Sequence, residues 1–146
     1  MTKPGVDAQN GPAAGPAALL REMFERTVIP KNAALFDDYY HPDFELTTNG
    51  IMQRFPEYKA AHVGVYETPI RYSIRYDEDT WVETADRVAV RMWITTERPG
   101  ESPTELELVL IATLLDGKLH RLWELTWPDW SRLDAFEQYP GVPGPA

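Results

Sequence analysis

The chain contains no cysteine among its 146 residues. This absence excludes disulfides, thiolate nucleophiles, and zinc or iron–sulfur sites built on cysteine. No apolar run approaches the roughly 20 residues that a transmembrane helix needs. The segment from Met1 to Pro16 lacks the basic and apolar regions of a signal peptide. We therefore expect a cytoplasmic protein with no membrane partner.

Basic residues are also scarce, because 14 Lys and Arg stand against 23 Asp and Glu, for a net charge of -9. An acidic surface repels nucleic acid phosphates, so we expect no nucleic acid partner. No glycine-rich phosphate loop follows a predicted strand, which argues against a nucleotide cofactor. The three histidines have no metal-binding spacing, since they lie in a turn, a helix and a strand. The sequence predicts no metal and no cofactor.

The length fits one domain with flexible ends. Residues 1–15 are Gly, Pro, Ala and polar residues with almost nothing to bury, which predicts a disordered N-terminal arm. Residues 16–139 form the predicted domain, and residues 140–146 (PGVPGPA) form a flexible tail.

Helical periodicity precedes strand periodicity along the domain. Helices are predicted over 16–29, 32–40 and 55–67, with a short strand over 44–48 that ends at an Asn-Gly turn. Alternating patterns then predict strands over 70–76, 88–96, 105–115 and 118–127. This order is typical of an α+β domain rather than of an alternating parallel α/β domain.

Asp116-Gly117 is a strong signal for a two-residue hairpin turn. Regular pairing from this turn would put Glu124 opposite Val109, on a mixed polar and apolar face. Trp123 would lie opposite Leu110, on a face that is almost entirely apolar. The mixed face fits a polar pocket, solvent or a subunit interface equally well.

Four segments resemble the nuclear transport factor 2-like superfamily, and its SnoaL-like branch in particular. They are DDYYHPDFELTTNG, FPEYKAAHVGVYE, RVAVRMWITT and DGKLHRLWELTWPDW, within residues 17–130. The most specific piece is the last hairpin, with Asp116, Gly117, Lys118, Leu119, Trp123 and Glu124. The resemblance implies a cone in which three N-terminal helices pack on a curved antiparallel sheet around a mostly apolar pocket. It also implies a homodimer that packs through its sheets.

The superfamily includes isomerases, cyclases, epoxide hydrolases, dehydratases and non-catalytic domains, so the fold alone does not decide the activity. Ketosteroid isomerases have a general-base aspartate where this chain has Thr47, which cannot carry that proton. The Arg-x-Asp pair of limonene-type epoxide hydrolases corresponds to Arg91-Met92-Trp93, which lacks the carboxylate. SnoaL-type cyclases use an acid directly after the hairpin tryptophan, and Glu124 occupies that position.

Glu124 and His62 are therefore the candidate proton carriers. A carboxyl group in an apolar pocket has a raised pKa, which suits acid–base chemistry. The competing interpretations are a surface glutamate beside Arg121 or His120, and a core histidine satisfied by a tyrosine or a carbonyl group. The candidate ligand-positioning residues are Thr47, Tyr66, Arg91 and Trp93.

Our leading hypothesis is a SnoaL-like protein that binds a small apolar organic molecule. Its cofactor-free chemistry would be an isomerisation, cyclisation, dehydration or hydrolysis. The alternative is a non-catalytic ligand-binding domain or dimeric scaffold.

Overall fold

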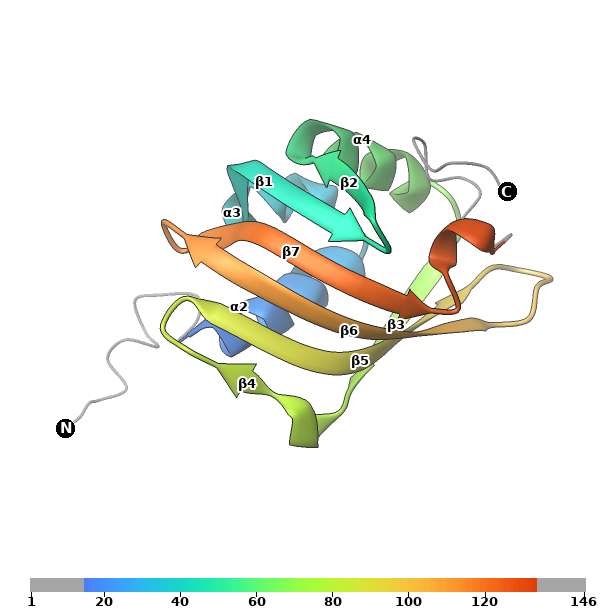
Figure 1. Ribbon diagram of the computed structural model, residues 1–146. Coiled ribbons are helices and arrows are strands. Elements are labelled where there is room, and N and C mark those ends of the chain that lie inside the picture. Colours follow the sequence, from blue (N-terminus) through green and yellow to red (C-terminus); the bar gives the residue numbers. More distant parts are fainter. Residues whose placement is uncertain (1–14, 134–146) are drawn as a thin grey trace.

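A computed structural model describes residues 15–133. The predicted tail, and the predicted arm apart from Gly15, lie outside the described residues. The fold is built on one curved sheet in the order β2-β1-β7-β6-β5-β3, with β4 paired to β5 (Figure 1). The strands are β1 (Tyr40–Thr48), β2 (Ile51–Arg54), β3 (Arg71–Tyr76), β4 (Val82–Glu83), β5 (Arg87–Glu97), β6 (Thr104–Leu115) and β7 (Lys118–Trp127).

The sheet is mixed rather than antiparallel, because β1 runs parallel to β7. The other strand pairs are antiparallel. Neighbours in sequence joined by short turns must run antiparallel, whereas β1 and β7 come from opposite ends of the domain and are free to pair in parallel. The predicted α+β class is confirmed, and the predicted antiparallel sheet is corrected at this pair.

The helical segments differ in part from the three predicted N-terminal helices. Helix α2 (Pro16–Met23) continues as a π-helical turn, Phe24–Val28. The second predicted helix is a 3-10 turn, Ala33–Leu35, followed by the single turn of α3 (Phe36–Tyr39). Tyr40, the last residue of the second predicted helix, is instead the first residue of β1. The pairing of β1 within the sheet overrides the helical pattern of the sequence. Helix α4 (Phe55–Tyr66) follows β1 and β2, so it is not N-terminal to the sheet.

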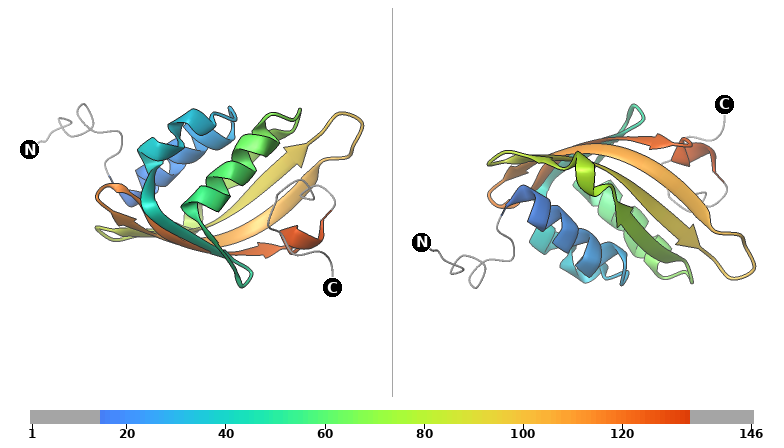
Figure 2. Two further views of the ribbon diagram at one scale, coloured as in Figure 1. Left: turned by 90° about the horizontal axis from the view of Figure 1, so that it is seen from above. Right: turned by 90° about the horizontal axis from the view of Figure 1, so that it is seen from below.

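Within residues 15–133, helices α2, α3 and α4 lie on the concave face of the sheet, and none of them covers the convex face (Figure 2). The core forms between the helices and the concave face, where Leu20, Phe36, Met92 and Leu110 are fully buried. The convex face instead exposes a band of large apolar side chains on its two central strands. These are Val109, Ile111, Trp123, Leu125 and Trp127, which we call the convex apolar band.

A β-bulge decides which face of the sheet receives Glu124. The β6–β7 pairing starts as predicted, with Leu115 opposite Lys118, but shifts by one residue at His120. Beyond the shift Leu110, not Val109, lies opposite Glu124. One extra residue reverses the face of every later side chain in the strand. Glu124 therefore turns toward the helices, and the predicted pairing of this part of the hairpin is wrong.

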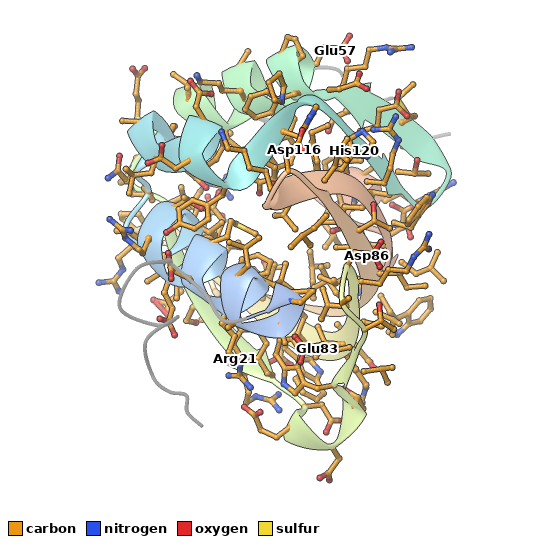
Figure 3. The ribbon with its side chains drawn as sticks, turned by 90° about the vertical axis from the view of Figure 1, so that its left-hand side faces the viewer. Arg21, Glu57, Glu83, Asp86, Asp116 and His120 are labelled. Atoms are coloured by element: carbon orange, nitrogen blue, oxygen red, sulfur yellow. The ribbon has the colours of Figure 1, made fainter. Side chains whose placement is uncertain are left out.

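The first helix is capped by a residue distant in sequence. Gly15 precedes α2 and has no side chain that could cap it. The Ala17 backbone N–H instead donates a 2.9 Å hydrogen bond to Glu83 Oε1, which lies beside the helix N-terminus (Figure 3). A Cβ atom at position 15 would lie 2.7 Å from that oxygen. The glycine therefore leaves room for the carboxylate that satisfies an N-terminal amide of the helix.

Candidate functional site

A cavity of about 110 Å³ lies between the helices and the concave face of the sheet. Most of its wall is apolar, which suits a small organic ligand. The apolar lining includes Met23, Phe24, Val28, Phe44, Leu46, Ile94, Leu106, Leu108 and Leu122. The polar side chains in the wall are Tyr40, Thr48, Gln53, Tyr58, His62, Tyr72, Glu124, Thr126 and Trp130.

Glu124 is the acidic residue of the cavity wall. Its side chain is half-buried in the cavity wall, where most neighbouring side chains are apolar. Desolvation by burial raises the pKa of Glu124 to about 7, against an ordinary value of 4.5. The carboxyl group therefore exists in both protonation states near neutral pH, which a general acid or base requires.

Thr48 lies beside Glu124, because parallel pairing of β1 with β7 puts the two residues opposite each other. The nearby Thr48 hydroxyl opposes the rise in the pKa of Glu124. Thr48 is only 2% exposed, so its hydroxyl lies against the carboxyl group rather than in solvent. The two side chains therefore form one polar site in the apolar wall.

Two tyrosine hydroxyls form a second polar group in the cavity wall. Tyr40 Oη and Tyr58 Oη are 3.0 Å apart, and Tyr40 Oη donates to Met23 Sδ at 3.3 Å. Burial raises the pKa of Tyr40 and of Tyr58 well above 10, and the charge of Glu124 adds to both shifts. The pair therefore stays protonated, with the Tyr40 hydrogen on Met23 Sδ and the Tyr58 hydrogen on Tyr40 Oη.

His62 faces the same cavity from helix α4. Its Nδ1 lies 2.8 Å from the carbonyl oxygen of Tyr58, and because a carbonyl group only accepts, Nδ1 carries the hydrogen. Desolvation by burial lowers the pKa of His62 to about 4, although this hydrogen bond opposes the shift. The imidazole is therefore neutral at pH 7, and its ring packs against Phe36 and Tyr58.

The other expected ligand-positioning residues lie away from the cavity wall. Thr47 pairs with Trp123 and shares its convex-side orientation, while its neighbour Thr48 points inward. Tyr66 is buried beside Phe36 and Tyr72 without lining the cavity. Of the six residues expected in the site, the structure brings Glu124 and His62 together in one cavity.

Arg91 and Trp93 belong to the convex face, because Val90, Met92 and Ile94 take the inward positions of β5. Arg91 forms ion pairs with Asp77 at 2.9 Å and Glu107 at 2.6 Å. Its guanidinium stacks 4.5 Å from the Trp93 ring centroid. These contacts satisfy the arginine on the convex surface.

Sequence reasoning missed seven polar residues of the cavity: Tyr40, Thr48, Gln53, Tyr58, Tyr72, Thr126 and Trp130. For Thr48 a signal was present, because Phe44, Leu46 and Thr48 are spaced two residues apart and are all buried. For the tyrosine pair no local signal exists, since β1 and α4 bring the two hydroxyls together only in the folded chain.

Within residues 15–133, no group of three or more His, Asp or Glu side chains is arranged to hold a metal ion. None of the helices in this part of the chain is long and apolar enough to cross a membrane.

No protein-family model matches the sequence, and no curated protein matches it. Solved structures do share the arrangement of a curved sheet with helices on its concave face. One is AclR, a putative hydroxylase from Streptomyces galilaeus, with a TM-score of 0.61, 18% identity, and coverage of 87% of this chain and 83% of that one. A second is a putative SnoaL-like polyketide cyclase from Jannaschia sp. CCS1, with a TM-score of 0.58, 13% identity, and coverage of 100% and 99%. The chain has the nuclear transport factor 2-like fold.

An epoxide hydrolase of the LEH-like type from M. tuberculosis also has this fold, with a TM-score of 0.60, 10% identity, and coverage of 84% of this chain and 85% of that one. The resemblance read from the sequence is thus confirmed for the fold. Identities of 10–18% carry no activity from these proteins to this one.

Proposed function

We propose that this nuclear transport factor 2-like domain binds a small, largely apolar organic molecule in its cavity and transfers a proton to or from it through Glu124. The observation that carries the proposal is the carboxyl group of Glu124, which lies in an apolar cavity and has a pKa raised to about 7 by desolvation. The SnoaL-like cyclase and the epoxide hydrolase among the similar structures are consistent with such a pocket enzyme.

The cavity size supports a ligand of about one ring. A cavity of about 110 Å³ is somewhat smaller than an engineered apolar cavity of about 150 Å³ that binds benzene. The hydroxyl groups of Thr48, Tyr40 and Tyr58 lie in the cavity wall, and when a ligand binds the Tyr40 hydroxyl can turn from Met23 Sδ to an oxygen of the ligand. We therefore propose a small cyclic carbonyl compound as the substrate class.

In the proposed reaction, the Glu124 carboxylate takes a proton from the carbon next to the carbonyl group. The C–H bond electrons move into a carbon–carbon double bond, and the carbonyl oxygen becomes an enolate stabilised by the nearby hydroxyl donors. Protonated Glu124 then returns a proton to carbon. His62 is not the proton carrier in this scheme, because a pKa of about 4 makes its imidazole a much weaker base than the Glu124 carboxylate, whose pKa is about 7.

Hydrogen exchange of cyclohexanone in D2O tests this proposal. We expect the wild-type protein to accelerate deuterium incorporation next to the carbonyl group, and Glu124→Gln to abolish the acceleration. Glu101→Gln is the matched control, because Glu101 is exposed in the loop between β5 and β6. Binding of cyclohexanone without accelerated exchange would contradict the enzymatic proposal and support a non-catalytic binding domain.

We also propose that two copies of the chain associate through the convex apolar band. Leu125 is 67% exposed and Trp127 is 75% exposed on a face that no helix covers in the described residues. A monomer rarely exposes a continuous patch of large apolar side chains. A two-fold axis would bring the same band of both copies together, with the Arg91 ion pairs at its rim.

A further inference from the structure

A short 3-10 turn, Trp130–Arg132, follows β7 after two residues. Trp130 lines the cavity from this turn. The turn lies beside the β1–β2 turn in space, although about 80 residues separate them in sequence (Figure 1). Asn49 sits at the tip of that β1–β2 turn, with a positive φ of 48°.

The Asn49 side chain connects the two turns by three hydrogen bonds. Its Oδ1 accepts from the Thr126 backbone N–H at 3.0 Å. Its Nδ2 donates to Thr126 Oγ1 at 2.8 Å and to Asp129 Oδ1 at 3.2 Å. One carboxamide therefore uses its acceptor and its donor group on the segment that leads from β7 to Trp130.

The groups that Asn49 contacts hold the next part of the turn. Thr126 Oγ1 accepts from the Trp130 backbone N–H at 3.1 Å and donates to the carbonyl oxygen of Pro128 at 2.9 Å. Asp129 Oδ1 accepts from the Ser131 N–H at 3.1 Å and from the Ser131 hydroxyl at 2.8 Å. The network thus runs from the Asn49 carboxamide to the backbone on both sides of Trp130.

Asn49 also contacts the strand that carries the proton carrier. Its backbone N–H donates to the carbonyl oxygen of Glu124 at 3.1 Å. The residue before it, Thr48, is the buried neighbour of the Glu124 carboxyl group. A single residue therefore contacts both the Glu124 backbone and the turn that carries Trp130.

We propose that Asn49 is a positioning residue of the site, which holds Trp130 against the cavity and so keeps water away from Glu124. The inference rests on the proposed function in treating the cavity as the ligand site. It goes beyond that function by assigning the closure of the cavity to one carboxamide. A glutamate that remains shielded keeps the elevated pKa that proton transfer near neutral pH requires.

Asn49→Gly is the decisive variant. Glycine adopts a positive φ without strain, so the turn backbone is preserved while the three side-chain hydrogen bonds are lost. The matched control is Asp116→Gly, because Asp116 also precedes a glycine at positive φ in a two-residue turn. Asp116 precedes the start of β7, whereas Trp130 follows its end.

Two NMR readouts on the full chain decide the proposal. In Asn49→Gly we expect the Trp130 backbone amide to exchange with solvent at least about tenfold faster than in the wild type. We also expect the Glu124 carboxyl group to titrate closer to its ordinary value of 4.5 than to about 7. Asp116→Gly leaves both readouts at their wild-type values.

Asn49→Asp provides a second test if the glycine variant folds poorly. Aspartate keeps the acceptor for the Thr126 N–H but cannot donate to Thr126 Oγ1 or Asp129 when ionised, so Trp130 amide exchange again accelerates. If the Trp130 amide exchanges at the wild-type rate in a folded variant, Asn49 does not hold the Trp130 turn and the proposal is wrong. Faster exchange with an unmoved Glu124 titration overturns its role in excluding water.

These results are separable from the proposed function. A wild-type Glu124 that titrates at its ordinary value contradicts the proton-transfer proposal, whereas Trp130 exchange still decides whether Asn49 holds the turn. If the Glu124 pKa is raised in the wild type and Asn49→Gly changes neither readout, the proton-transfer proposal stands and the positioning role of Asn49 is wrong.

Discussion

Replacing Glu124 with glutamine changes the stability of the fold in a way that depends on pH. Glutamine keeps the size of the side chain and can never ionise. The wild-type carboxyl group is protonated in the folded state up to a pH of about 7, but its ordinary pKa is 4.5. Between these values the unfolded chain releases a proton that the folded chain retains, so the wild type loses stability as the pH rises.

The size of this loss follows from the two pKa values. The interval between 4.5 and about 7, at roughly 1.4 kcal/mol for each pKa unit, corresponds to about 3 kcal/mol of unfolding free energy. The cost is absent well below pH 4.5 and is complete above about pH 7. Glu124→Gln does not incur the cost, so its advantage over the wild type grows from near zero to about 3 kcal/mol across this window.

Urea unfolding at about pH 4 and about pH 8 measures the effect as the change in the difference between variant and wild type. Glu101→Gln is the control, because an exposed loop substitution changes stability by no more than roughly 0.5 kcal/mol. If the unfolding free energies of Glu124→Gln and wild type differ by the same amount at both pH values, the claim that the Glu124 carboxyl group is desolvated is wrong. A difference that favours the wild type at the higher pH would indicate instead a glutamate stabilised by a surface ion pair.

Three further predictions test the fold and its surfaces. Gly15→Ala displaces the Glu83 carboxylate from the start of α2, and we expect scanning calorimetry to show a melting temperature lower by a few degrees. Leu110→Ala empties a fully buried position, and denaturant unfolding should show a loss of about 3 kcal/mol. Leu125→Glu should convert a dimer into a monomer of 16.7 kDa in light scattering, and a wild-type protein that is already monomeric at micromolar concentration would contradict the proposed dimer.

Much of the fold was predictable because its signals are local. Helix α4 begins at Phe55 and β7 spans Lys118–Trp127, both as predicted from periodicity and turn residues. The parallel pairing of β1 with β7 was not predictable in this way, because it joins distant strands and leaves no pattern in either one.

The bulge in β7 shows where the prediction of the site failed. Counting in steps of two from the Asp116-Gly117 turn put Glu124 and Val109 opposite each other, while the structure pairs Glu124 with Leu110. The strand did contain a signal, since Leu119 and Leu122 are both buried although they are three residues apart. Two inward residues at an odd spacing require one extra residue between them, which is a bulge.

The candidate site was predictable only in part for a related reason. Glu124 was expected from the family resemblance, and His62 from its place among the apolar residues on one side of α4. Both line the cavity in the structure. Thr47 was expected because it occupies the position of the ketosteroid isomerase aspartate, whereas the alternation of β1 points Thr48 inward. The Asn49 network depends on the path of the chain after β7, which no local pattern encodes.

The central claim is that Glu124 is a desolvated carboxyl group inside a ligand cavity. Its side-chain carboxyl carbon, observed by 13C NMR during a pH titration and assigned with Glu124→Gln, reports the ionisation of that one group. We predict a midpoint of about 7. A midpoint near the ordinary value of 4.5 would contradict the claim, and with it the proton transfer that we propose for this protein.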